Sequence, residues 1–307
     1  MDSAGNIYVA NGGEITSAPS ISIYTAGSNG CLTPSAVISG TTDLVQPAGL
    51  TVDSNLNIHV TDFFSDGIAV FSAGSTGNVA PIKAIADPNT GIDFPLGVAF
   101  NSHSNIFVAN AGSQDGGFDS ITSYLAGSNA NVAPTTTISS GGATDKTGLN
   151  DPDAIALGAD SGFWVANALG GASGNGSLTW YAHGSNGNVA PQVVITGSNT
   201  GLNDPVGLAI NTANNPFVLN ASGGPDYAGS VTVYSYTNSG NVAPLKTIQG
   251  TSSSNITGLE FPSGLALDSS NSIYVTNDGS VSGGVDSVTM RPAAVATPRR
   301  WRPFQAR

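Results

Sequence analysis

Carboxylates are the side chains in this sequence that are best placed to do chemistry. The 307 residues include 20 Asp and Glu against 8 Lys and Arg. Four of these acids lie at expected tight turns, Asp2, Asp53, Asp160 and Asp268. The others stand at or beside longer connections between expected strands, which predicts one strongly negative face. Clustered carboxylate oxygens suit Ca²⁺, and a carboxylate can also act as a general base.

The same acids also have a purely structural interpretation. Asp and Asn side chains hydrogen-bond to their own backbone in turns, so they are common before proline and after strands. The pattern alone therefore leaves two alternatives open, a cation-binding mouth and a set of turn formers.

The remaining chemistry-bearing residues form no catalytic set. His59 takes the place of an aromatic residue in a repeat, so we expect it to pack between blades, whereas His103 and His183 fall in expected turns. The single cysteine, Cys31, excludes an internal disulfide. No Gly-rich segment opens a helix that could cradle a phosphate. These residues predict neither a Ser-His-Asp triad nor a nucleotide site.

A repeat of roughly 53 residues supplies the elements that must position the acids. A phrase ending in V-A-N or a variant recurs six times, with its valines at Val9, Val60, Val108, Val165, Val218 and Val275. A second phrase, P-x-G followed by an aliphatic residue, begins at Pro47, Pro95, Pro205 and Pro262, with a degenerate copy at Pro152. A third, G-N-V-A-P or a variant, ends at Pro81, Pro134, Pro191 and Pro244.

Each repeat predicts four short strands, and six repeats favour an all-β, six-bladed β-propeller with four-stranded blades. Met1 begins inside a unit, so the first blade is expected to lack its innermost strand. We expect one domain over residues 1–297, with its last outer strand at 292–296. Residues 298–307 are basic and match no strand, which predicts a non-native or disordered tail. The alternative is that this tail supplies the missing innermost strand.

Composition and charge exclude several classes of function. Helix formers such as Met, Glu and Lys are scarce, which argues against a helical bundle or a βαβ nucleotide fold. A net charge of −12 makes nucleic acid and anionic membranes poor partners. Cations, neutral carbohydrates and other small neutral ligands remain possible, and we expect a monomer. The low lysine and cysteine content is typical of a secreted or periplasmic bacterial protein, although no signal peptide is present.

The phrases P-x-G-L-A-x-D and N-I-Y-V-A-N resemble those of NHL-repeat propellers and of the related SMP-30, gluconolactonase and paraoxonase group. The resemblance covers about residues 2–290. The second group implies a calcium-dependent lactonase or esterase whose metal lies where the inner strands begin. Carried onto this chain, the resemblance implies that Asp153, Glu260 and Asp204 bind Ca²⁺, with Asn150 or Asn203 completing the shell.

In that interpretation Asp151 or Asp93 is the general base, which takes a proton from the attacking water while the cation stabilises the developing oxyanion. The substrate is expected to be a sugar lactone or an N-acyl-homoserine lactone. NHL-type propellers also include proteins without catalysis. A non-catalytic extracellular propeller that binds a polymer or a protein is therefore the alternative function.

Overall fold

Short antiparallel strands make up almost all the regular structure of the chain. The computed structural model describes residues 1–12, 18–28, 32–40, 42–171, 174–222, 229–249, 258–278, 287–291 and 302–305. These ranges hold 23 strands and one 3-10 helix, η1 (Gly112–Asp115). No helix in the described part of the chain is long and apolar enough to cross a membrane.

The strands group into one three-stranded sheet and five four-stranded sheets, each ordered as the chain runs. The first three sheets contain β1 (Ile7–Asn11), β2 (Ser20–Tyr24), β3 (Ala36–Ser39); β4 (Pro47–Val52), β5 (Ile58–Asp62), β6 (Gly67–Phe71), β7 (Lys83–Ile85); and β8 (Pro95–Phe100), β9 (Ile106–Asn110), β10 (Ser120–Tyr124), β11 (Thr136–Ser139). The other three contain β12 (Pro152–Leu157), β13 (Phe163–Asn167), β14 (Ser177–Tyr181), β15 (Val193–Ile195); β16 (Pro205–Ile210), β17 (Pro216–Asn220), β18 (Ser230–Val233), β19 (Lys246–Gln249); and β20 (Pro262–Leu267), β21 (Ile273–Asn277), β22 (Ser287–Arg291), β23 (Arg302–Gln305).

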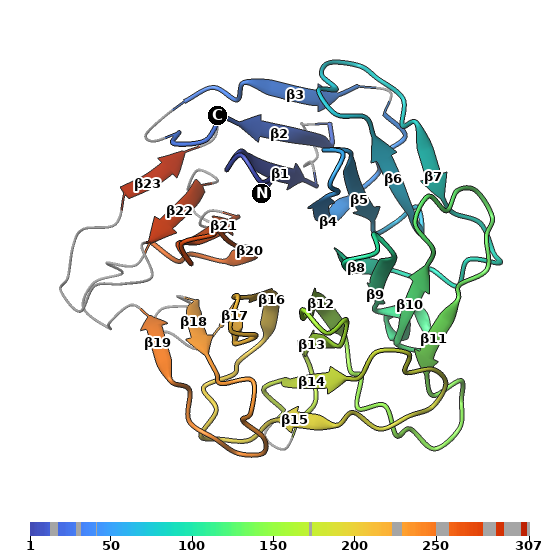
Figure 1. The fold of residues 1–307 in the computed structure, drawn as a ribbon, viewed down its shortest axis with the longest axis vertical. Helices are drawn as coiled ribbons and strands as arrows, with labels where there is room; N and C mark the ends of the chain where they lie inside the picture. Colours follow the sequence, from blue (N-terminus) through green and yellow to red (C-terminus); the bar gives the residue numbers. More distant parts are fainter. Residues whose placement is uncertain are drawn as a thin grey trace. The chain divides into compact units, whose positions relative to one another are not determined.

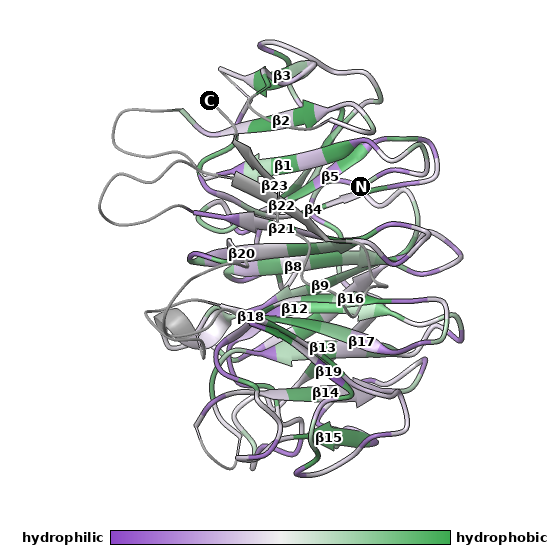
Figure 2. Cartoon of the chain, turned by 90° about the vertical axis from the view of Figure 1, so that its left-hand side faces the viewer, coloured by the Kyte–Doolittle hydropathy of each residue, from purple (hydrophilic) through white to green (hydrophobic). Residues whose placement is uncertain are grey.

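This arrangement is an all-β propeller fold with four-stranded antiparallel blades, as the repeat predicted. We number the six sheets as blades 1 to 6. In Figure 1, strand β8 lies between β4 and β12, so the first strands of blades 2, 3 and 4 pack side by side. In Figure 2, short hydrophobic stretches alternate with hydrophilic turns along the chain, which explains why the strands are short.

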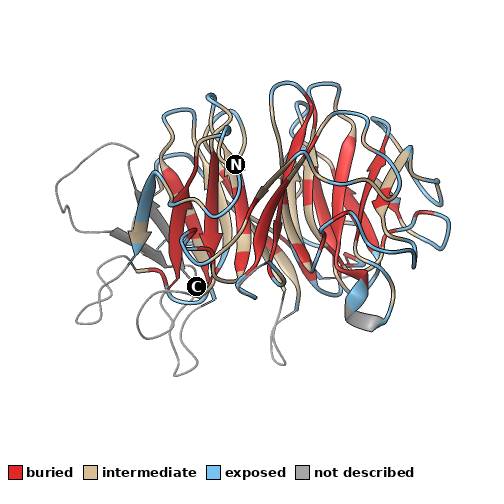
Figure 3. Ribbon diagram, turned by 90° about the horizontal axis from the view of Figure 1, so that it is seen from below, coloured by how far each residue is buried: buried red, intermediate tan, exposed pale blue. Residues whose placement is uncertain are grey.

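Apolar side chains are buried between successive blades rather than within one blade. Ile38 of blade 1 and Phe71 of blade 2 belong to one cluster, and Ile85 of blade 2 and Tyr124 of blade 3 belong to the next. A separate cluster joins blades 5 and 6. Figure 3 shows the result, with strands largely buried and their connections exposed. Because a blade cannot cover both its faces alone, the repeat requires its neighbours.

The chain divides into two compact units, which we describe separately. Unit 1 comprises Met1–Ala26, Pro34–Val165 and Trp180–Gln192, and unit 2 comprises Gly27–Thr33, Ala166–Thr179 and Val193–Arg307. Blades 1 to 3 fall mainly in unit 1, and blades 5 and 6 fall in unit 2.

The first and last blades differ in how well their strands match the prediction. The first blade has three strands among the described residues and begins with the V-A-N strand, as predicted. In the last blade, the fourth strand is β23, which pairs with β22 in an antiparallel register from Ser287↔Gln305 to Met290↔Arg302. The segment 292–296, expected to form that strand, lies outside the described residues. Residues 302–305 therefore form a strand, although their sequence matches no strand of the repeat. Pairing with a free strand edge requires backbone N–H and C=O groups rather than a particular pattern of side chains.

Candidate functional site

A buried asparagine at the end of the V-A-N strand holds the loop that leads into the first strand of the blade. In blade 3, Asn110 Oδ1 accepts the backbone N–H of Asp93 at 3.4 Å. The equivalent bonds in unit 2 join the pairs Asn203–Asn220 and Glu260–Asn277, both at 3.1 Å. One repeated contact therefore positions three of the residues singled out from the sequence.

The amide end of each asparagine is bound just as regularly. Asn220 is fully buried, and its Nδ2 donates to the hydroxyl oxygens of Ser230 and Thr232, both at 3.2 Å. Blades 3 and 4 repeat these bonds with Asn110, Ser120, Thr122 and with Asn167, Ser177, Thr179. We call this arrangement the asparagine clasp. In the sequence, V-A-N predicted only a strand, and this role of its last residue was not predicted.

Blade 2 carries a different version of the clasp. Asp62 replaces the asparagine and is 2% exposed. Its carboxylate accepts the backbone N–H groups of Val45 at 2.6 Å and Gln46 at 3.0 Å. The strand opposite has Gly67 and Ala69 where blades 3 to 5 have serine and threonine. A carboxylate only accepts hydrogen bonds, so it cannot replace the donating amide of asparagine, and Gly67 and Ala69 have no side-chain acceptor that would lose such a donor.

The residue directly before the first strand has a left-handed backbone in four blades. The φ angles are 48° at Phe94, 55° at Asp151, 56° at Asp204 and 47° at Phe261. Aspartate tolerates this region, whereas a bulky phenylalanine is strained there. The loop geometry is thus set by the repeat, and the side chain at this position is aromatic in blades 3 and 6 and acidic in blades 4 and 5.

The loops that carry both predicted bases approach η1 in unit 1, and we refer to these residues and Asp119 together as the Asp93–Asp119–Asp151 cluster. The Asp119 carboxylate accepts the backbone N–H of Asp151 at 2.8 Å through Oδ2 and that of Ser113 at 3.1 Å through Oδ1. Ser113 lies in η1, beside Gly112. The Oδ2 atom of Asp93 lies 2.5 Å from the position that a Cβ atom on Gly112 would take. The start of η1 therefore links the loops of Asp93 and Asp151, and Asp119 is a positioning residue that spacing in the sequence did not reveal.

The five predicted calcium ligands are divided between the units. Asn150 is exposed and Asp153 is the half-buried second residue of β12, both in unit 1. Asn203, Asp204 and the exposed Glu260 belong to unit 2. Within the described ranges, no three acidic, histidine or cysteine side chains gather closely enough to hold a metal ion. Ca²⁺ binding therefore stays a prediction.

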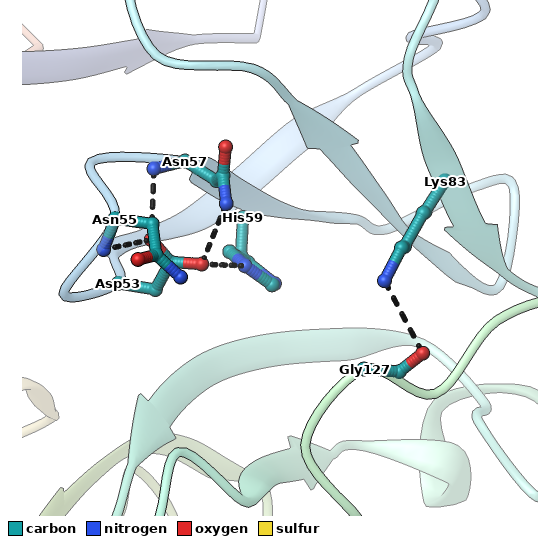
Figure 4. A network of polar contacts seen from close by, with 6 residues as sticks. All are labelled: Asp53, Asn55, Asn57, His59, Lys83 and Gly127. Atoms are coloured by element: carbon teal, nitrogen blue, oxygen red, sulfur yellow. Dashed lines mark hydrogen bonds and ion pairs between the residues drawn. The ribbon is translucent and has the colours of Figure 1, made fainter.

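His59 is buried and contacts a partly exposed polar network on the turn between β4 and β5 (Figure 4). Its Nε2 is 3.3 Å from Asp53 Oδ2, and its ring packs edge-on against Phe100 at 4.7 Å between centroids. Burial lowers the pKa of His59, against the opposing hydrogen bond and charge of Asp53. Burial alone would raise the pKa of Asp53, but hydrogen bonds, chiefly from Asn57, hold it below its usual value. The predicted packing of His59 between blades is confirmed.

Replacing His59 with tyrosine should make the protein less sensitive to acid. The unfolded chain binds a proton at His59 near pH 6.5, whereas the folded chain resists it, so this residue costs stability as the pH falls below about 6.5. Tyr8 and Tyr274 occupy the equivalent positions and donate to Asp2 and Asp268. His59→Tyr should therefore keep the bond to Asp53 while the loss of melting temperature between pH 7.5 and 5.5 becomes smaller. The exposed His103, changed to asparagine, should leave that loss unaltered, and an equal effect of both variants would contradict the assignment.

Three phenylalanine rings lie together in the loops of blades 2 and 3. Phe63 contacts Phe64 at 5.1 Å and Phe94 at 4.8 Å between ring centroids, each pair edge to face. Phe64 is 62% exposed. Phe94 follows the candidate base Asp93 directly in the sequence.

Comparisons with known proteins support the fold and leave the reaction open. No family model and no curated protein match the chain. Solved structures do match it. A proposed 6-phosphogluconolactonase from Bacteroides fragilis is 13% identical, with 99% of this chain and 83% of that chain covered and a TM-score of 0.58. Virginiamycin B lyase from Staphylococcus aureus, in complex with quinupristin, is 9% identical over 99% and 86%, with a TM-score of 0.56.

A third similar structure is the PQQ-bound aldose sugar dehydrogenase from Streptomyces coelicolor. It is 15% identical over 84% of this chain and 80% of that chain, with a TM-score of 0.53. At these identities the likeness shows the fold alone, and one fold commonly carries unrelated reactions. The chain therefore has the β-propeller fold that it shares with lactonase-type, lyase and dehydrogenase structures.

Proposed function

We propose that this chain is a lactonase-type hydrolase of small neutral lactones, with its reaction at the Asp93–Asp119–Asp151 cluster. The observation that carries the proposal is the link between the loops of Asp93 and Asp151 through Asp119 and η1. It places two candidate bases in loops that enter neighbouring inner strands, β8 and β12. The fold of a proposed phosphogluconolactonase is the analogy that favours this reaction class.

The proposed chemistry is general-base hydrolysis of a cyclic ester. Asp93 or Asp151 accepts a proton from a water molecule as the water oxygen bonds to the lactone carbonyl carbon. The ring carbon–oxygen bond then breaks, and the carboxylic acid returns the proton to the leaving oxygen, giving a hydroxy acid. Asp119 holds the Asp151 backbone and does not act on the substrate. A cluster of negative charge favours neutral substrates over anionic ones.

Changing Asp93 and Asp151 to asparagine, singly and together, tests the proposal. At least one single variant should lose about 100-fold or more of kcat with a gluconolactone or a homoserine lactone, because a positioned base contributes about that much. Melting temperatures should stay close to that of the parent. Asp160→Asn is the matched control, since that exposed residue sits at a turn between β12 and β13. Full activity in the double variant would exclude this cluster as the site.

Calcium dependence is a separate proposal that the same assay can decide. Its proposed ligands are Asp153, Glu260, Asp204, Asn150 and Asn203. Millimolar Ca²⁺ should raise the melting temperature, since a ligand specific for the folded state stabilises it. Asp153→Ala should abolish that rise and Asp268→Ala should not. Unchanged melting with intact turnover would remove calcium while leaving the hydrolase proposal standing.

We also infer that the repeat closes as a six-bladed propeller of the NHL and SMP-30 type. Six sheets among the described residues, each beginning or continuing with the same phrases, support this number. An experimental structure with five or seven blades would overturn it.

A non-catalytic binding propeller is the second candidate, and one observation favours it. Both oxygens of Asp119 and both oxygens of Asp62 are occupied by backbone N–H groups, which is the structural use expected of turn-forming acids. A lactone panel with no turnover by the parent chain would select this alternative over hydrolysis.

A further inference from the structure

The phenylalanine pair of blade 2, Phe63 and Phe64, is not required by the fold of a blade. A repeated backbone bond identifies the equivalent positions: Phe63 N–H donates to Gln46 O, as Ala111 N–H donates to Phe94 O and Ala221 N–H to Asp204 O. Blades 3 and 5 thus fold with alanine where blade 2 has Phe63. The next residue is Phe64 in blade 2 but Gly112 in blade 3 and Ser222 in blade 5. The aromatic pair is an addition to the repeat.

Phe94 of blade 3 adds a third ring to the same place. Its φ of 48° puts a bulky side chain in the left-handed region, where aspartate stands in blades 4 and 5 and Phe261 stands in blade 6. The Asp66 carboxylate accepts its backbone N–H at 2.9 Å and so fixes this conformation. Local strain of this kind persists where the surrounding structure enforces it, and such sites are often functional.

Phe64 is 62% exposed, and Phe63 and Phe94 are half-buried beside it. The pairs of rings are inclined by 66°, 74° and 79°, so their planes are close to mutually perpendicular. The exposed Asp66 lies beside them, since its carboxylate accepts the Phe94 N–H. The face of an aromatic ring attracts cations, and a nearby carboxylate adds to that attraction.

We propose that Phe63, Phe64 and Phe94 form a binding site for a small organic cation with an apolar body, such as an aromatic quaternary ammonium ion. The ring surfaces receive the apolar body, and the ring faces with Asp66 receive the charge. The charge complementarity selects the cation over a neutral or anionic ligand of the same shape. This site does not depend on lactone hydrolysis.

Titration of the full chain with benzyltrimethylammonium tests the site directly. Calorimetry or NMR at low ionic strength should show saturable binding, with weaker binding of benzyl alcohol, tetramethylammonium and phenylacetate. Phe64→Ala and Phe63→Ala should each raise the Kd about fivefold or more, the scale of a lost cation–π contact. Phe118→Ala is the matched control, because Phe118 is also an exposed loop phenylalanine, at 52%. Its Kd should equal that of the parent.

Phe94→Gly separates binding from folding. Glycine adopts the left-handed region without strain, so this variant should melt at or above the temperature of the parent while its Kd rises. Equal binding of the cation and of phenylacetate would overturn the proposal, as would no binding at 20 mM or an effect of Phe118→Ala as large as that of Phe64→Ala.

Discussion

Asn220→Asp should destabilise the protein by about 3 kcal/mol or more, the largest effect we expect from a change of so few atoms. The asparagine is fully buried and donates to the hydroxyls of Ser230 and Thr232 and, at 3.5 Å, to the carbonyl oxygen of Ser230. Aspartate would place a charge there and face that carbonyl with a second acceptor. Urea denaturation followed by circular dichroism measures the change.

Blade 2 supplies the control for that variant. Its Asp62 is buried opposite Gly67 and Ala69, so the matching triple change is Asn220→Asp with Ser230→Gly and Thr232→Ala. If the hydrogen bonds of the clasp cause the destabilisation, the triple variant should lose less free energy of unfolding than the three single variants lose in sum, because the residues are coupled. A triple variant whose losses simply add would show that Asp62 depends on other features of blade 2.

The repeat made the strands and their order predictable from the sequence, because each copy carries the same turn chemistry. The repeat also contains a second regularity, between the first residue of a turn and the aromatic position that follows it, which was not used for the prediction. Where the turn before the V-A-N strand begins with aspartate, the aromatic position holds a side chain that can bond to it, in the pairs Asp2–Tyr8, Asp53–His59 and Asp268–Tyr274. Where it begins with asparagine, the position holds phenylalanine, at Phe107 and Phe217.

The candidate site was predictable only in part. The loops of Asp93, Asn203 and Glu260 could be placed from the repeat, since the clasp is the same in each blade. The bond from Asp119 to Asp151 joins residues 32 apart in different blades, and η1 occurs in blade 3 alone among the described blades. Such irregular contacts depend on packing between blades, which a repeat pattern does not encode.

Packing between blades also governs the last prediction, that Gly49→Ala costs about 3 kcal/mol. A Cβ atom on Gly49 would lie 2.0 Å from the carbonyl oxygen of Leu96 in β8, which also accepts the Thr61 hydroxyl at 2.6 Å. The clash is with backbone, so β4 and β8 must separate. Gly207 occupies the same position of the repeat, but its neighbours are leucine side chains at 3.0–3.2 Å. Gly207→Ala should therefore cost clearly less, and urea midpoints at unchanged slope compare the two. Equal losses in the two variants would contradict this explanation. They would mean that the P-x-G phrase uses glycine for its conformational freedom rather than for the close approach of two blades.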